Sequence, residues 1–133
     1  MIVFLDTNIV IYFVENPPVF GARATGHLTS LRTAGNTFAV SDLVRLECRV
    51  FPLRHSNLTL LGQFDAFFGS SDVCVLPLSA LVCDRATQLR ATHNFKTPDA
   101  LQLAAAIIHG CDRFLTNDTR LSACTDLPID VLP

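Results

Sequence analysis

The fold is decided by the stretch MIVFLDTN at residues 1–8. Its part Ile2–Leu5 is wholly apolar and rich in β-branched side chains, which is typical of a central strand buried on both faces. Asp6 follows at once, so it lies at the carboxyl end of that strand. Parallel α/β sheets carry their sites at this edge. The stretch therefore predicts both a sheet and the place of its functional site.

Alternating strand and helix patterns continue along the rest of the chain. Further strands are predicted at residues 37–40, 73–76, 113–115 and 129–132, and helices at residues 8–15, 19–33, 42–53, 57–68, 80–93 and 97–109. This alternation predicts a three-layer α/β fold, with a central twisted parallel sheet of about five strands and helices on both faces. Because no repeat or linker divides the chain, we expect residues 1–133 to form a single domain.

The composition indicates the surroundings in which the protein works. Charged residues make up 17% of the chain, against about 25% in ordinary domains, so we expect a partner or a second copy to cover apolar surface. No apolar run approaches the roughly 18 residues that span a bilayer, so we expect a cytoplasmic protein without a membrane segment. The five cysteines are odd in number and form no C-x-x-C motif. They predict buried free thiols in a reducing compartment.

Three aspartates follow strands or begin a helix in this pattern. Asp118 follows the strand at 113–115 as Asp6 follows the first strand, so the two share one edge of the sheet. Asp99 lies near the start of the helix at 97–109, which is apolar nearly all round and therefore predicted to be buried. Helix capping and the helix dipole are the structural explanations for these acids.

Glu47 is the fourth acid, in the middle of a nearly apolar helix. A carboxylate on an apolar face is costly unless it is paired or binds a cation. An ion pair with Arg54 is the structural alternative. Asp42 competes for the same role, but its place after the capping residue Ser41 explains it as a first-turn acid. We therefore prefer Glu47.

Together these four acids predict a metal site. Carboxylates that converge on one edge raise one another's pKa unless a positive charge lies among them. A site built only from carboxylates, hydroxyls and water suits Mg²⁺ or Mn²⁺, whereas zinc would recruit His or Cys. Such an ion polarises a phosphodiester and lowers the pKa of a bound water. The sequence therefore predicts metal-dependent phosphodiester hydrolysis.

The same residues resemble a known family, the PIN domain, and in particular the VapC-type toxins of bacterial toxin–antitoxin pairs. The resemblance is carried by FLDTN at 4–8, the acid inside an apolar helix, TPDALQLAAA at 97–106 and LTND at 115–118, and it covers essentially the whole chain. It implies a Mg²⁺- or Mn²⁺-dependent endoribonuclease, a cognate antitoxin and a homodimer. The residues that match the family's site are Asp6, Glu47, Asp99 and Asp118 for the acidic quartet, Asn8 beside the first acid and Thr116 beside the last.

The RNA-binding residues are harder to predict, because the net charge is −2. A local basic patch would have to hold RNA, and we expect it at the mouth of the site from Arg85, Arg90, Lys96, Arg113 and Arg120. The class of RNA stays open. Two alternatives also stay open: a stand-alone RNA-processing PIN nuclease, and a non-catalytic PIN-like module that binds RNA or protein. A phosphatase with an aspartate nucleophile would need a second Asp where the chain has an Asn.

Overall fold

The computed structural model describes residues 1–133 and contains five strands and six α-helices. The strands are β1 (Ile2–Leu5), β2 (Thr37–Ser41), β3 (Val73–Leu76), β4 (Arg113–Thr116) and β5 (Ile129–Val131). The helices are α1 (Thr7–Glu15), α2 (Phe20–Thr33), α3 (Asp42–Arg54), α4 (Leu58–Phe68), α5 (Ala80–Thr92) and α6 (Thr97–Ile108). Every predicted element is present, and a short 3₁₀-helix, η1 (Thr119–Ala123), was not predicted.

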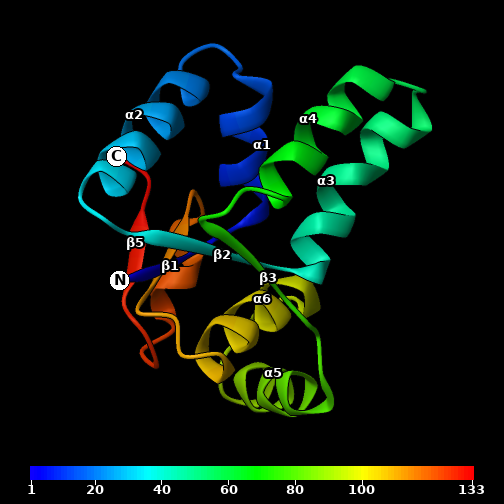
Figure 1. Ribbon diagram of the computed structural model, residues 1–133. Coiled ribbons are helices and arrows are strands. Elements are labelled where there is room, and N and C mark those ends of the chain that lie inside the picture. The colour runs from blue at the N-terminus through cyan, green and yellow to red at the C-terminus, as the bar shows by residue number, and fades with distance from the viewer.

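The five strands form one sheet in the order β3-β2-β1-β4-β5, and all neighbouring strands are parallel. The first strand of the chain therefore lies in the middle of the sheet. In Figure 1, helices α1 to α4 lie on one side of the sheet and α5 and α6 on the other. The predicted three-layer arrangement is confirmed.

The core is built on the central strands and on α6. Phe4 of β1 and Phe114 of β4 are fully buried and stack with their ring centroids 5.1 Å apart. Along α6, Ala100 and residues 103–106 are buried. Three of these four consecutive residues are alanines, and small side chains let a helix approach its neighbours closely. The predicted burial of this helix is confirmed, and its first turn is fixed in place beside the carboxyl edge of the sheet.

The surface differs from the prediction at two cysteines. All five cysteines are free thiols, as predicted, and Cys48 and Cys124 are buried. Cys74 and Cys83, however, are exposed. Cys74 lies on β3, an edge strand of the sheet, and Cys83 lies on α5 beside its buried residues Val82 and Ala86. An apolar neighbourhood in the sequence therefore did not ensure burial. None of the helices has the length and apolar character required to cross a bilayer.

Candidate active site

A polar cleft of about 240 Å³ at the carboxyl edge of the sheet contains all four predicted acids. Its lining has no hydrophobic residue and consists of Asp6, Thr7, Asn8, Glu47, Lys96, Pro98, Asp99, Gln102, Asp118 and Arg120. These residues come from the end of β1, from α1, α3 and α6, and from the segment after β4. The fold thus brings together side chains that are more than 100 residues apart in the chain.

Asp6 is held in place by two hydrogen bonds. The backbone N–H of Thr7 donates to its Oδ1 over 2.9 Å, which caps α1, and the hydroxyl of Thr116 donates to its Oδ2 over 2.7 Å. Burial raises the pKa of Asp6; the two hydrogen bonds oppose this shift, and the charges of Asp99 and Glu47 add to it. The capping explanation is thus correct for Asp6, and the acid still faces the cleft.

Thr116 lies beneath the cleft instead of lining it, because its side chain is fully buried at the end of β4. Its hydroxyl also accepts a hydrogen bond of 3.0 Å from the backbone N–H of Asp118. One buried hydroxyl therefore connects Asp6 to the segment that carries Asp118. Thr116 was predicted as a site residue, and its position makes it a positioning residue.

Asp99 and Asp118 are near neighbours with opposite pKa shifts. Burial raises the pKa of Asp99, and the charge of Asp118 raises it further, while Arg120 and Lys96 lower it. Asp118 accepts hydrogen bonds from the side chain of Arg120, with Nε–Oδ1 3.0 Å and Nη2–Oδ2 2.5 Å, and these lower its pKa. It also caps η1 through the backbone N–H of Arg120. Asp118 is thus the acid of the cleft that has its own cationic partner.

Glu47 reaches the cleft, but not for the reason the sequence suggested. Its side chain is exposed, and it forms no ion pair with Arg54. Its helical neighbours Val50 and Phe51 are 39% and 54% exposed, whereas the buried residues of α3 are Val44, Cys48 and Pro52. The Oε1 atom of Glu47 accepts a hydrogen bond of 2.7 Å from the hydroxyl of Thr7. The expected burial of Glu47 is therefore wrong, although its membership of the cleft is correct.

Comparison with known proteins identifies the fold that carries this cleft. The family model of the PIN domain matches residues 3–126. The chain belongs to the PIN domain family. No curated protein matches the sequence.

Solved structures agree with this PIN assignment at the level of fold. VapBC2 from Rickettsia felis, bound to a DNA fragment from its promoter, has 21% identity and a TM-score of 0.81, with 100% of both chains covered. DNA-bound VapBC from Salmonella typhimurium has 17% identity and a TM-score of 0.79, covering 100% of this chain and 99% of the other. VapC20 from Mycobacterium tuberculosis, a toxin that cleaves the sarcin–ricin loop, has 18% identity and a TM-score of 0.72, covering 91% and 93%.

Two polar side chains in the cleft of this PIN domain, Thr7 and Gln102, were not predicted from the sequence. Gln102 is 2% exposed. Its Nε2 donates to Oε1 of Glu47 over 3.3 Å and to the hydroxyl of Thr7 over 3.4 Å, while its Oε1 accepts from the hydroxyl of Ser41. Gln102 is the one polar residue in the otherwise apolar stretch 100–108 of α6, and that exception was the signal available in the sequence.

The predicted basic patch is only partly present. Lys96 and Arg120 line the cleft. Arg113 lies at the amino end of β4, on the opposite edge of the sheet, and pairs there with Asp130. Arg85 pairs with Asp126 over 2.7 Å and does not line the cleft. The prediction is wrong for Arg113 and Arg85. Arg113 lies at the wrong end of its strand, and Arg85 lies on a side of α5 that does not face the cleft.

The donor set of the cleft fits a hard divalent cation in its chemistry. All four acids offer carboxylate oxygens, and four negative side chains face only Lys96 and Arg120 as positive ones. The raised pKa values of Asp6 and Asp99 indicate that a further positive charge would stabilise their ionised forms. As the side chains stand, no three acids, histidines or cysteines lie close enough together to hold one ion. Glu47 and Asp118 are turned toward Thr7 and Arg120 instead.

Asp42, the rival of Glu47, lies elsewhere. It belongs to a separate cavity that is also lined by Arg45 and Asp65. Its position in the first turn of α3, after the N-cap Ser41, agrees with the structural explanation. The preference for Glu47 as the cleft residue is therefore correct.

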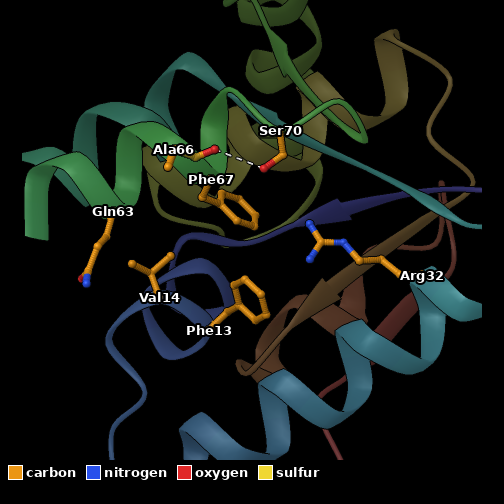
Figure 2. A pocket seen from close by; sticks show the side chains of 7 residues that line it. All are labelled: Phe13, Val14, Arg32, Gln63, Ala66, Phe67 and Ser70. Atoms are coloured by element: carbon orange, nitrogen blue, oxygen red, sulfur yellow. Dashed lines mark hydrogen bonds between the residues drawn. The ribbon is translucent and has the colours of Figure 1, made fainter.

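A larger cavity of about 420 Å³ lies away from the acids (Figure 2). Its lining comes from α1, α2, α4 and the turn that follows, namely Phe13, Val14, Arg32, Gln63, Ala66, Phe67 and Ser70. Figure 2 shows the rings of Phe13 and Phe67 and the guanidinium of Arg32 around it. No carboxylate, histidine or cysteine lines this cavity. The four predicted acids therefore lie in the smaller, polar cleft and not in this cavity.

Proposed function

We propose that this PIN domain is a VapC-type toxin, a divalent-metal-dependent endoribonuclease of a toxin–antitoxin pair. The observation that carries the proposal is the cleft with four carboxylates and only two cationic side chains. The family supports the assignment, as does the likeness in fold to VapC20, a toxin that cleaves the sarcin–ricin loop, and to chains of VapBC complexes.

We propose that Asp6, Glu47, Asp99 and Asp118 hold the ion, Mg²⁺ or Mn²⁺. When bound, the ion would lower the pKa of a water molecule and stabilise the charge of the phosphodiester. Binding requires Asp118 to share its oxygens between Arg120 and the ion, and Glu47 to do so between Thr7 and the ion.

The other residues of the cleft orient these acids and bind the substrate. The hydroxyl of Thr116 donates a hydrogen bond to Oδ2 of Asp6. The Oδ1 atom accepts the hydrogen bond from Thr7 that caps α1. Gln102 and Thr7 hold Glu47 at the cleft wall. We propose that Asn8, which is exposed at the mouth, donates hydrogen bonds to the RNA.

The proposal includes two protein partners, a cognate antitoxin and a second copy of the chain. Large apolar side chains are exposed along α3 and at the start of α4, with Leu46 at 57%, Phe51 at 54%, Leu53 at 53% and Leu58 at 72%. Exposed apolar surface of this kind marks interaction sites. The proposed activity places the protein in the cytoplasm, where its RNA substrates are.

The test combines growth with cleavage. Induced expression of the wild-type chain in bacteria should stop growth, and co-expression of the product of the neighbouring gene should restore it. The purified chain should cleave single-stranded RNA in Mg²⁺ or Mn²⁺ and not in EDTA, and Asp6→Asn should lose both effects. Cleavage that persists in EDTA, or a fully active Asp6→Asn, would overturn the proposal.

Two other outcomes separate the alternatives. Metal-dependent cleavage without growth arrest, and without an inhibitory neighbour, would replace the toxin by a stand-alone RNA-processing nuclease. RNA binding without any cleavage in either metal would replace it by a non-catalytic module.

A further inference from the structure

We propose that a basic pocket beside the cleft binds a backbone phosphate of the RNA strand that the cleft receives. The basic pocket is lined by Arg90, Asn94, Phe95, Lys96 and Arg120. This inference rests on the proposed function, because it names where the substrate of that site is held. It goes beyond it by assigning a phosphate subsite to particular side chains.

The basic pocket and the acidic cleft are contiguous. The pocket has a volume of about 320 Å³, and three of its five lining residues are cationic while none is acidic. Lys96 and Arg120 line both the pocket and the cleft. A strand that leaves the carboxylates therefore passes directly onto positive side chains, without crossing a wall of the protein.

Arg90 is fixed in the pocket without being neutralised. Its Nε donates to the carbonyl oxygen of Phe95 over 3.1 Å, and its Nη1 donates to the hydroxyl of Thr97 over 3.0 Å. No carboxylate pairs with it, whereas Arg32, Arg49, Arg85, Arg113 and Arg120 each pair with an aspartate. A guanidinium has five N–H donors, so three remain for a ligand, and its positive charge is uncompensated.

This arrangement suits a phosphate. The planar guanidinium matches the oxygens of a phosphate in a bidentate way. Because the hydrogen bonds to Phe95 and Thr97 already restrict Arg90, little side-chain entropy remains to be lost on binding. Lys96 adds a second free cation, since it forms no ion pair.

The basic pocket would offset the repulsion between the carboxylates of the cleft and an RNA strand. Four carboxylates repel a polyanionic strand until cations offset them, and the net charge of −2 provides no general attraction. Backbone phosphate contacts supply most of the sequence-independent affinity for nucleic acids. A local anchor next to the cleft would therefore allow this chain to hold RNA despite its acidic balance.

The test compares two arginines of the same helix. Arg90→Gln removes the unpaired guanidinium, and Arg85→Gln, also on α5, removes one that is already paired with Asp126. Binding of a fluorescent single-stranded RNA is measured by anisotropy in EDTA over a range of NaCl concentrations. Arg90→Gln should weaken binding about tenfold and reduce the slope of log K against log salt by about 0.7, the value for one phosphate contact on a single strand. Arg85→Gln should leave both unchanged.

A second arm locates the phosphate. Methylphosphonate linkages, which carry no charge, are placed at one position of the RNA at a time. One position should weaken binding to the wild type but not to Arg90→Gln, because contacts that share a partner are not additive. Arg90→Gln that binds RNA as the wild type does, or that loses no more than Arg85→Gln, would overturn the pocket.

Binding in EDTA does not depend on cleavage, so the two proposals fail separately. RNA binding that needs Arg90 in a chain that cleaves no RNA would support the pocket and overturn the nuclease. Cleavage with an unchanged KM in Arg90→Gln would support the nuclease and overturn the pocket. Melting curves of both variants verify that they remain folded.

Discussion

Strand β4 is flanked by an arginine–aspartate pair at each end, and the two pairs have different surroundings. At its amino end, Arg113 contacts both carboxylate oxygens of Asp130 on β5. Beyond its carboxyl end, Arg120 contacts both oxygens of Asp118. In each pair the guanidinium lowers the pKa of the aspartate. The pairing chemistry is therefore the same.

The two pairs differ in the charged side chains that surround them. The Arg113–Asp130 pair is balanced, one charge against one. At the carboxyl end Asp6, Asp99 and Glu47 are added. Burial raises the pKa of Asp6, with a smaller contribution from Asp99 and Glu47, and burial raises the pKa of Asp99, with a smaller contribution from Asp118 and Glu47. An ion pair alone does not mark a site. A group of carboxylates with too few cationic side chains around it does mark a candidate site, because a bound cation would stabilise its ionised form.

The largest expected effect separates the two paired aspartates. Asp118→Asn should lower the rate of RNA cleavage at least about 100-fold, because it removes one of the proposed metal ligands and its charge. Asp130→Asn removes the equivalent charge at the other end of β4 and should leave the rate within about twofold. Cleavage rates in Mg²⁺ under single-turnover conditions measure both. Equal losses of cleavage rate in the two variants would contradict the link between the group of acids in the cleft and catalysis.

A smaller effect is expected at the support of Glu47. Gln102→Leu keeps the size of the side chain but removes its hydrogen bonds to Glu47 and Ser41. Loss of such an outer contact typically lowers metal affinity about 10- to 100-fold, which a calorimetric titration with Mn²⁺ would measure. Gln63→Leu, at the cavity of Figure 2, is the control and should bind Mn²⁺ as the wild type does. Unchanged affinity in Gln102→Leu would remove Gln102 from the site.

The negative charge of Asp6 should also lower the thermal stability of the metal-free protein. Since the pKa of Asp6 is raised in the fold, its protonated form favours folding, and this contribution is lost as the pH rises from its unfolded value of 3.8 through the folded one. Asp6→Asn removes the charge and should raise the Tm of the metal-free protein at pH 7 by about 3 °C, or about 1 kcal/mol. The gain should vanish at about pH 3, where Asp6 of the wild type is protonated and therefore as neutral as the Asn of the variant.

Melting curves between pH 3 and pH 7, with and without Mg²⁺, provide the measurement. Added Mg²⁺ should raise the Tm of the wild type and not that of Asp6→Asn, because only the former binds the ion. A lower Tm for Asp6→Asn at pH 7 would show that the hydrogen bonds of the carboxylate outweigh the cost of burying its charge.

The smallest effect is expected at the balanced pair. Arg113 and Asp130 are 36% and 34% exposed, so solvent screens their attraction. Arg113→Gln should cost less than about 1 kcal/mol of unfolding free energy in urea and leave the cleavage rate unchanged. A loss of cleavage in this variant would contradict the division between the two ends of β4.

The fold could be predicted almost completely from the sequence, for physical reasons. Apolar runs such as residues 37–40 lie between turn or capping residues, here Gly35-Asn36 and Ser41, so strands and helices were separable. The 3₁₀-helix η1 was missed because five residues show no periodicity. At the level of secondary structure, local sequence was sufficient.

The site was predictable only where a residue follows a strand or begins a helix. Asp6, Asp99 and Asp118 were placed by that rule. Glu47 was found for a wrong reason, since it is exposed, as are its apolar helical neighbours Val50 and Phe51. Thr7 and Gln102 contact Glu47 only because α1, α3 and α6 meet at the cleft, and no local pattern encodes that meeting.

The decisive measurement is a titration of the wild-type chain with Mn²⁺ by calorimetry, beside Asp99→Asn and Asp130→Asn. If the excess of carboxylates is a metal site, the wild type and Asp130→Asn should show the same saturable binding, and Asp99→Asn should show none at the same concentrations. Saturable binding that survives in Asp99→Asn, or no binding by a wild-type chain that cleaves RNA, would contradict the assignment of the cleft as the metal centre.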